Sequence, residues 1–348
     1  LQPEPEHQPL PHFVNVELAA APAALPDDAL CRRILETARA GACVAVICNL
    51  VDHAQRLAQY LRNITSDVPI DLFHARFRFC DRQRREREIV DAYGPSRPSG
   101  RGRVLIATQV VEQSLDLDFD WLVTQLCPVD LLFQRLGRLH RHQRARPDGF
   151  KSPQVSVLLP QEKDFGLHAL IYGNVRVLWR TRQLLEKDQK IDFPRAYRDW
   201  IERVYDEDDW PNEPEEIMAA ADEWTSKQIA ARQEALQLAN EDMGAWADED
   251  SRTHFLTRDG EMSLTVLPMA DGALLDGRRL DEFDEWERAE MLNQHAVSVP
   301  ANWKSFLPEA EDGVHRLSMR AENDAWVIEL DNVQLVYSED YGMERRAL

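Results

Sequence analysis

Two hydrophobic patterns alternate along residues 27–160. Short runs that are apolar at nearly every position and rich in β-branched residues are typical of strands buried on both faces of a sheet. Between them, apolar residues recur every three or four positions, which predicts amphipathic helices. The expected strands are residues 43–49, 70–75, 103–109, 121–126 and 154–160, and the expected helices are residues 27–41, 51–64 and 130–142. Strands that alternate with helices predict an α/β fold, a parallel sheet flanked by helices on both faces.

The pattern changes after residue 160. An acidic, proline-bounded run leads into an alanine-rich segment at residues 211–240, which predicts one long connecting helix. Short strand-like runs beyond Asp248, at residues 262–268 and 325–337, predict a small α+β domain. The expected parts are therefore a sheet domain at residues 1–160, a helical extension and linker at 161–250, and an accessory C-terminal domain at 251–348.

Charge is distributed unevenly between these parts. The formal net charge is -20, yet residues 1–160 contain 20 Lys+Arg against 19 Asp+Glu, so the rest of the chain contains 21 against 42. Nine arginines fall between Arg76 and Arg103, a density that suits a phosphate-facing surface. The same arginines also fit a solvated helix face, because Glu86 and Glu88 can pair with neighbouring arginines. Both interpretations stay open.

Several classes of protein are disfavoured by the sequence. No apolar run is long enough to span a membrane, and the amino terminus lacks the basic start and apolar centre of a secretory signal. We therefore expect a cytoplasmic protein without a membrane partner. The five cysteines form no CxxC pair and no metal-ligand spacing, so we expect core residues and no metal site. The first residue is Leu1, and a proline-rich segment follows, so we expect a piece of a longer protein.

Polar residues follow the predicted strands. Asn49, His74 and Thr108 lie at or just past strand ends, where parallel sheets bind ligands. The stretch "QRLGRLHRH", from Gln134 to His142, also places three arginines at intervals of three on a predicted helix. Asn49, His74 and Thr108 are therefore candidate ligand-binding residues.

Four segments occur in the order and spacing of motifs IV, IVa, V and VI of superfamily 2 helicases. They are "CVAVICNLVDHAQRL", "FHARFRFCDRQRRERE", "ATQVVEQSLDLDFD" and "DLLFQRLGRLHRH". The set resembles the second RecA-like lobe of these enzymes. Gln113-Ser114 and His140 stand where the superfamily usually has an Arg-Gly pair and a glycine, and in this the chain resembles the CRISPR-associated helicase-nuclease of type I systems. The resemblance implies a RecA-like sheet, a helical linker and an accessory domain.

The resemblance implies that ATP with Mg²⁺ binds between two RecA-like lobes, of which this chain holds the second. Arg138 and Arg141 match the arginine fingers, whose planar guanidinium groups stabilise the charge of the transferred phosphoryl group. Gln134 matches a residue that positions a phosphate or water, and Arg135 matches a structural or interlobe ion-pair partner. Glu112 and Asp116 match the nucleotide side of motif V.

The resemblance also implies contacts to nucleic-acid phosphates, which need hydrogen-bond donors but read no sequence. The matching residues are Asn49, His74, Arg76, Thr108 and Gln113. Asn49 fits a helix N-cap equally well. We interpret Asp118 and Asp120 as a solvated strand edge. We expect Phe77 and Phe79 to pack against apolar residues rather than stack on bases.

Several motifs of the complete family are absent from the sequence. It contains no G-x-x-x-x-G-K-[ST] loop and no His-Asp nuclease pair with companion ligands. The resemblance implies that the first RecA-like lobe and the nuclease, with its metal ions, belong to an N-terminal half outside this chain. We therefore expect this fragment to be inactive alone and to bind ATP weakly.

In the complete protein, the resemblance implies 3'-to-5' movement on single-stranded DNA and degradation of foreign DNA marked by an RNA-guided CRISPR surveillance complex. An anti-CRISPR inhibitor is a further candidate partner. Two alternatives remain open. One is the second lobe of another nucleic-acid helicase, and the other is a non-catalytic docking module for the surveillance complex or an inhibitor.

Overall fold

The computed structural model describes residues 12–21, 25–112, 115–161, 165–241 and 263–348. It divides into two compact units. The sheet unit runs to Phe73 and continues over Glu88–Trp224, whereas the C-terminal unit consists of His74–Arg87 and the chain from Thr225 onward. The segment that carries motif IVa therefore belongs to the C-terminal unit and not to the sheet unit.

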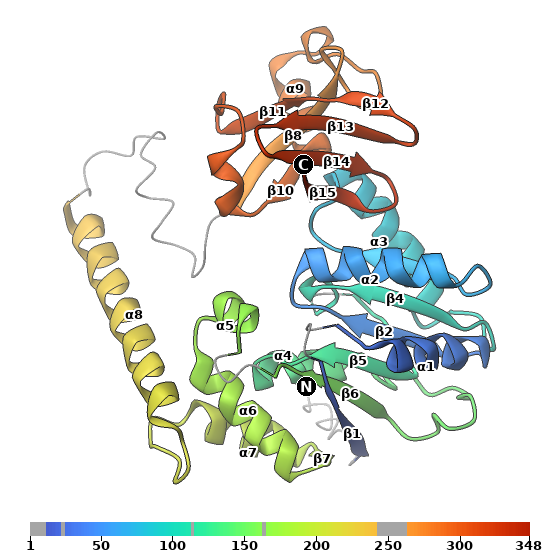
Figure 1. Ribbon diagram of the computed structural model, residues 1–348, viewed down its shortest axis with the longest axis vertical. Helices are drawn as coiled ribbons and strands as arrows, with labels where there is room; N and C mark the ends of the chain where they lie inside the picture. The colour runs from blue at the N-terminus through green and yellow to red at the C-terminus, as the bar shows by residue number, and fades with distance from the viewer. Residues whose placement is uncertain (1–11, 22–24, 113–114, 162–164, 242–262) are drawn as a thin grey trace, which may run out of the picture. The chain divides into compact units, whose positions relative to one another are not determined.

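The sheet unit contains a seven-stranded sheet in the order β3-β4-β2-β5-β6-β1-β7 (Figure 1). Its strands are β1 His12–Ala20, β2 Cys43–Ile47, β3 Ile70–Phe73, β4 Arg103–Ala107, β5 Trp121–Gln125, β6 Gln154–Leu159 and β7 Lys190–Phe193. All neighbouring strands are parallel except β7, which pairs antiparallel with β1. The five expected strands and their parallel pairing are thus confirmed, and β1 and β7 extend the sheet.

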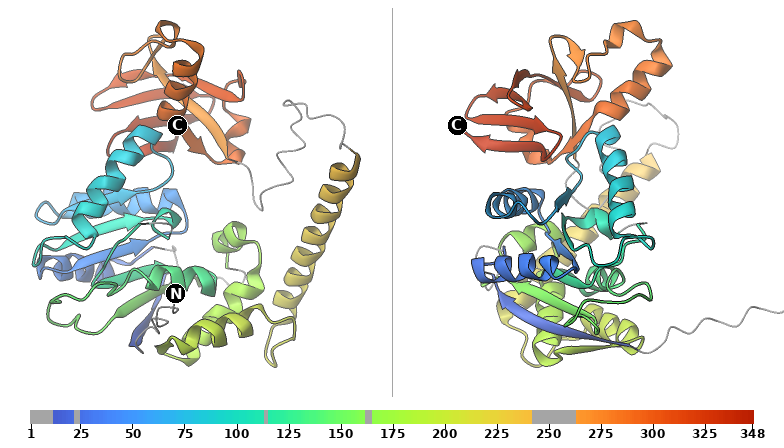
Figure 2. Two further views of the ribbon diagram at one scale, coloured as in Figure 1. Left: turned by 180° about the vertical axis from the view of Figure 1, so that it is seen from behind. Right: turned by 90° about the vertical axis from the view of Figure 1, so that its right-hand side faces the viewer.

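Helices cover both faces of this sheet. α1 (Asp28–Arg39) and α2 (Val51–Ile64) lie on one face, and α4 (Val129–Leu136) lies on the other (Figure 2). This arrangement follows from right-handed crossovers, because the chain moves along the sheet in one direction through α1 and α2 and in the other through α4. Asp27 caps α1 by accepting a hydrogen bond from Leu30 N at 2.8 Å.

The sheet unit continues past residue 160, the predicted end of the sheet domain, because β7 completes the sheet and further helices pack against its core. These elements are α5 (Leu167–Tyr172), α6 (Val175–Lys187), α7 (Arg195–Tyr205) and the start of α8 (Glu215–Glu241). Buried Arg180 on α6 stabilises the loop between α7 and α8 by donating to Glu213 and to the backbone oxygens of Asp206 and Asp208. α8 is the long helix that the alanine-rich segment predicts.

The C-terminal unit contains two four-stranded sheets and α9 (Glu285–His295). The first sheet contains β8 Leu264–Ala270, β9 Ala273–Leu274, β10 Val297–Val299 and β11 Val314–Ser318, and the second contains β12 Arg320–Glu322, β13 Ala325–Leu330, β14 Val333–Ser338 and β15 Gly342–Ala347. A two-residue turn joins β13 to β14, where Asp331 has a positive φ of 47°. This unit confirms the expected small α+β domain.

The elements of the described chain that are not named above are one helix and three 3-10 helices: α3 Phe79–Tyr93, η1 Gln109–Val111, η3 Leu280–Glu282 and η4 Ala301–Ser305.

Candidate functional site

The helix of motif VI is shorter than predicted. α4 ends at Leu136, and Gly137 is its C-cap, so the expected helix over residues 130–142 is wrong in its second half. The chain turns there because Leu139 forms a β-bridge with Phe119 and His140 adopts a positive φ of 52°. The three arginines of "QRLGRLHRH" therefore do not share one helix face.

Arg135, on the last turn of α4, is fully buried. Its Nε donates to Glu112 Oε1 at 2.7 Å and its Nη1 to Thr124 Oγ1 at 2.7 Å. Its Nη2 donates to Asn49 Oδ1 at 3.0 Å and to the Tyr172 hydroxyl at 3.1 Å. Burial alone would lower the pKa of Arg135, but its anionic and polar surroundings outweigh burial and raise the pKa. Arg135 thus joins motifs IV, V and VI inside the sheet unit, which supports its structural interpretation.

Arg138 and Arg141 lie beyond the helix in a different environment. Arg138 is half-buried and donates to two backbone oxygens, Val111 O at 3.2 Å and Glu112 O at 3.1 Å. Burial, together with the nearby charge of Arg141, lowers the pKa of Arg138. Within the described chain, no carboxylate forms an ion pair with Arg138. Its described hydrogen-bond acceptors are therefore uncharged backbone oxygens.

Arg141 is exposed and pairs with an exposed carboxylate. Its Nε lies 2.7 Å from Asp116 Oδ1, and the two side chains are 42% and 45% exposed. His142 Nε2 lies 2.9 Å from the same oxygen. Exposed ion pairs of this kind are weak and exchange readily. Gln134 is exposed on the last turn of α4.

Asp118 and Asp120 are buried, so the interpretation as a solvated strand edge is wrong. Both carboxylates accept hydrogen bonds from Arg146 at 2.8 Å, and Asp120 also accepts from Arg97 at 2.9 Å. The backbone N–H of Cys43 donates to Asp120 at 2.7 Å. Arginines from both sides of the sequence neutralise the two carboxylates, and this network fixes the chain that follows motif VI.

Asn49 does not cap α2. The N-cap of that helix is Leu50, which makes no side-chain cap bond, so the N-cap interpretation is wrong. The Asn49 side chain is buried and donates from Nδ2 to Leu126 O at 2.7 Å, while its Oδ1 accepts from Arg135 and Tyr172. Its backbone N–H donates to Gln125 Oε1 at 2.6 Å. In this structure, the polar groups of Asn49 are engaged inside the unit.

Thr108 is buried at the start of η1, directly after β4, and its backbone N–H donates to Phe73 O at 3.2 Å. Gln113 lies outside the described residues. The sheet unit therefore brings Asn49, Thr108, Glu112 and Arg135 together at the carboxyl ends of β2, β4 and β5. The chain beyond Gly137 leaves that edge, because Leu139 and His140 pair with Phe119, just before β5 begins.

The other two predicted nucleic-acid residues lie in the C-terminal unit. His74 and Arg76 are buried, and the Arg76 guanidinium carbon lies 5.1 Å from the centre of the Trp303 ring. The Arg76 backbone oxygen accepts from Met343 N at 2.8 Å. Phe77 is buried and stacks on His74, so the expectation that it packs in the core is confirmed.

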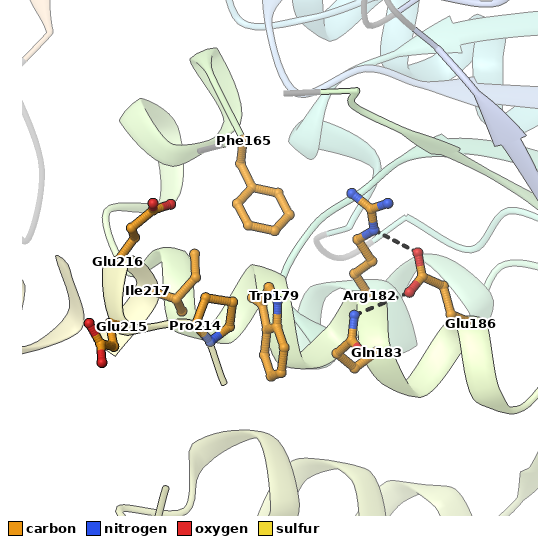
Figure 3. Close-up of a pocket in the computed structure, with 9 residues that line it drawn as sticks. All are labelled: Phe165, Trp179, Arg182, Gln183, Glu186, Pro214, Glu215, Glu216 and Ile217. Atoms are coloured by element: carbon orange, nitrogen blue, oxygen red, sulfur yellow. Dashed lines mark hydrogen bonds and ion pairs between the residues drawn. The ribbon is translucent and has the colours of Figure 1, made fainter. Parts of the chain in front are cut away.

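A pocket of about 580 Å³ opens elsewhere in the sheet unit (Figure 3). Its floor is apolar, and Arg182, at its edge, donates to Glu186 at 2.7 Å. The lining residues are Phe165, Trp179, Arg182, Gln183, Glu186, Pro214, Glu215, Glu216 and Ile217. They share no member with the residues predicted from motifs IV to VI.

The described residues contain neither a metal-binding cluster nor a membrane-spanning helix. No group of three or more His, Cys, Asp or Glu side chains there is arranged to hold a metal ion. No helix in the same residues is both long and apolar enough to cross a membrane. The five cysteines are unpaired, and four of them are buried.

The sequence did not point to Tyr172, His168 or Gln125, although all three contact Asn49. Tyr172 and His168 lie on α5, which follows the last recognisable motif and has only six residues. A helix of that length carries too little periodicity to mark its buried face. Gln125, a polar residue at the end of a buried strand, was the one detectable signal.

Two family models match the chain. "CRISPR-associated nuclease/helicase Cas3, C-terminal" matches residues 40–144, and "CRISPR-associated endonuclease/helicase Cas3, fourth domain" matches residues 261–345. Together they cover more than half of the chain. The CRISPR-associated endonuclease/helicase Cas3 of Escherichia coli (strain K12) is 42% identical over an alignment 354 residues long, which covers 98% of this chain and 40% of that relative. The chain thus spans less than half the length of this relative.

Solved structures agree in fold. A crystal structure of a CRISPR-associated protein has a TM-score of 0.82 at 26% identity, covering 97% of this chain and 41% of its own. T. fusca Cas3-ATP has a TM-score of 0.77 at 23% identity, covering 98% and 43%. A CRISPR RNA-guided surveillance complex, pre-nicking, contains a chain with a TM-score of 0.73 at 24% identity, covering 96% and 44%. This chain belongs to the Cas3 family of CRISPR-associated nuclease/helicases and corresponds to the C-terminal half of its members.

Proposed function

We propose that this chain supplies the second RecA-like lobe and the accessory C-terminal domain of an ATP-dependent DNA helicase and nuclease. The observation that carries the proposal is the contrast within motif VI. Arg135 is buried and neutralised by Glu112, whereas Arg138 and Arg141 are partly exposed and bind only backbone oxygens or an exposed carboxylate. A permanent cation without a buried partner suits a transient anion such as a nucleotide phosphate.

In this proposal, Arg138 and Arg141 reach the phosphates of an ATP molecule held by the first lobe. Their guanidinium groups stabilise the charge that develops on the transferred phosphoryl group, and Gln134 positions a phosphate or the attacking water. Asp116 is the partner that Arg141 leaves when nucleotide arrives. Glu112 holds the buried Arg135 with its carboxylate and accepts a hydrogen bond from Arg138 at its backbone oxygen. The T. fusca relative was crystallised as Cas3-ATP, which supports ATP as the nucleotide, and Mg²⁺ commonly accompanies such phosphates.

The proposed DNA contacts divide by motif. We assign direct phosphate contacts to Thr108 and Gln113 of motif V, which follows a strand that ends at the binding edge. The side chains of Asn49, His74 and Arg76 already contact other protein groups. We assign these three residues to holding the backbone that faces single-stranded DNA. Movement along that DNA is proposed to run 3'-to-5', as in the family.

The proposed partner in the cell is an RNA-guided surveillance complex that marks foreign DNA. A chain of similar fold occurs in such a complex in its pre-nicking state, which supports this choice. The nuclease and the first lobe belong to the proposed N-terminal half of the same protein. An inhibitor that docks on this chain would be a further partner.

The test is ATP hydrolysis by the full-length protein with single-stranded DNA. Arg138→Ala should lower kcat by about three to five orders of magnitude, the usual cost of a lost arginine finger. Arg32→Ala is the matched control, because Arg32 is an exposed arginine of the same unit on α1. Normal hydrolysis by Arg138→Ala would favour a non-catalytic docking module. Stimulation by single-stranded RNA rather than DNA would favour another class of helicase.

A further inference from the structure

The short helix α5 (Leu167–Tyr172) follows the last strand of the parallel sheet and lies outside motifs IV, V and VI (Figure 1). It nevertheless sends two polar side chains to the centre of the motif network. His168 is buried, and the Tyr172 hydroxyl lies within hydrogen-bond distance of both Asn49 and Arg135. None of the roles proposed above for motifs IV to VI uses these two residues.

The direction of each hydrogen bond around Tyr172 is fixed by chemistry. An arginine side chain only donates, so the Tyr172 hydroxyl accepts from Arg135 Nη2 at 3.1 Å. Its single proton then goes to Asn49 Oδ1 at 2.8 Å. Arg135 Nη2 also donates to the same Asn49 oxygen at 3.0 Å, so the three groups form a closed triangle. Burial raises the pKa of Tyr172, which keeps its proton in place.

The amide of Asn49 is oriented by the same logic. Its Oδ1 faces two donors, so its Nδ2 must point to the acceptors on the other side, Leu126 O at 2.7 Å and His168 Nδ1 at 2.8 Å. Because His168 Nδ1 accepts, the proton of the neutral ring resides on Nε2. α5 therefore holds Asn49 from both ends of its amide, with Tyr172 on the oxygen and His168 on the nitrogen.

Arg135 is linked to Arg138 by two routes. The backbone oxygen of Arg135 accepts from Arg138 N at 3.0 Å. The Arg135 side chain also binds the Glu112 carboxylate at 2.7 Å, while the Glu112 backbone oxygen accepts from Arg138 Nη2 at 3.1 Å. A shift of the Arg135 guanidinium would therefore move both the backbone of the turn and the backbone oxygen that orients the Arg138 side chain.

We propose that Tyr172 and His168 are positioning residues that hold the Asn49–Arg135 pair and thereby fix Arg138 for ATP hydrolysis. The inference rests on the proposed function of Arg138. It assigns to α5 the role of a clamp that closes the motif network from outside the motifs. Neither α5 residue touches the nucleotide in this proposal, so both act through Arg135 and Asn49.

The first test is Tyr172→Phe in the full-length protein, which keeps the ring and removes only the hydroxyl. Because one hydrogen-bonded contact to a charged group is lost, kcat of DNA-stimulated ATP hydrolysis should fall about tenfold. KM for ATP should stay unchanged, since the arginine acts in the transition state. The control is Tyr197→Phe, whose hydroxyl has no hydrogen-bond partner in the described part of the chain. Wild-type kcat for Tyr172→Phe, or an equal loss for Tyr197→Phe, would overturn the inference.

The second test is the pair Tyr172→Phe with Arg138→Ala. If Tyr172 acts through Arg138, the double variant should hydrolyse ATP no more slowly than Arg138→Ala alone. A further drop of about tenfold would mean that the hydroxyl serves another purpose and would overturn the inference. Wild-type activity in Arg138→Ala would instead overturn the proposed function, so the two failures are distinguishable.

His168 provides a separate check that does not depend on the hydroxyl. His168→Ala removes the acceptor for Asn49 Nδ2 and should lower kcat, whereas His168→Asn keeps an oxygen acceptor near the position of Nδ1 and should restore most of the rate. Thermal unfolding of each variant measures any loss of fold. Equal rates for the two His168 variants, with equal unfolding temperatures, would argue against the clamp.

Discussion

The last turn of α4 contains a buried arginine, whereas the turn that follows it contains two arginines that are partly exposed. Arg135 is fully buried and bonded to four side chains, whereas Arg138 and Arg141 bind backbone oxygens and an exposed carboxylate. A buried, fully paired guanidinium maintains a fold, while a partly exposed one remains able to meet an anion. Burial, rather than residue type or spacing, therefore separates Arg135 from Arg138 and Arg141.

The carboxylates of motif V differ in the same way. Asp116 is 45% exposed and pairs with Arg141 and His142. Asp118 and Asp120 are buried and hold Arg97 and Arg146. The difference does not follow from strand alternation, because residues two apart would share one face of a regular strand. Only the exposed carboxylate of Asp116 has a weakly held partner.

The largest effect on stability is expected for Arg135→Ala. It leaves the Glu112 carboxylate buried without its cation, and breaking a buried ion pair in this way costs about 3–5 kcal/mol of unfolding free energy. Urea unfolding of this chain measures the loss. Arg138→Ala is the matched variant and should change the unfolding free energy by less than about 1 kcal/mol, because its partners are backbone oxygens. Equal losses in the two variants would break the comparison between the two turns.

The buried ion pairs of Glu213 with Arg176 and Arg180 should also stabilise the sheet unit, and the pH dependence of stability can test this. Burial alone would raise the pKa of Glu213, but hydrogen bonds from Arg176 and Arg180 outweigh burial and lower the pKa to about 2. The folded state therefore favours the charged carboxylate. Its stabilisation is present above the usual pKa of 4.5 and is lost as pH falls toward 2.

The shift corresponds to roughly 3 kcal/mol at neutral pH, at 1.36 kcal/mol per pKa unit. Glu213→Gln should therefore unfold more easily than the wild type at pH 6. The difference should shrink between pH 4.5 and pH 2, where the wild-type carboxylate takes up its proton. Unfolding free energies of both proteins across this range measure the effect. A difference that is constant with pH would mean that the charge of Glu213 does not stabilise the unit.

The sequence predicted the parts of the fold that local pattern determines. The run 43–47 is apolar and rich in β-branched residues, and it forms β2 in the interior of the sheet. β7 was not predicted, because a four-residue edge strand owes its existence to pairing with β1 and carries little pattern of its own. The end of α4 was missed because arginine and leucine continue the helical spacing past Gly137, while the bridge from Leu139 to Phe119 overrides it.

The sequence motifs named the candidate residues but not which of them are buried. Motif spacing brought Arg135, Arg138 and Arg141 together, but spacing contains no information on which side chain enters the core. The burial of Asp120 depends on Arg97 and Arg146, which lie more than twenty residues away in opposite directions. Such partners become apparent only when the chain is folded, because long-range ion pairs leave no local pattern.

The smallest effect is expected at the exposed pair of Asp116 and Arg141. Asp116→Asn should change the unfolding free energy by less than about 1 kcal/mol, since exposed pairs contribute little. The matched control is Glu17→Gln, which removes an ion pair with Arg33 of the same length, 2.7 Å, and similar exposure, 43% and 48%. The two variants should be equally stable, because water screens both pairs alike.

In the full-length protein only Asp116→Asn should alter ATP hydrolysis. Arg141 no longer has to leave a carboxylate before it binds phosphate, so KM for ATP should fall by up to about fivefold, the equivalent of one weak ion pair. Steady-state kinetics of the two variants at equal salt measure the change. A raised KM would mean that Asp116 itself contacts the nucleotide or its Mg²⁺, and an identical change in Glu17→Gln would mean that general surface charge sets KM. Either result would contradict the prediction, because the prediction requires that the exposed Asp116 carboxylate compete with ATP for Arg141.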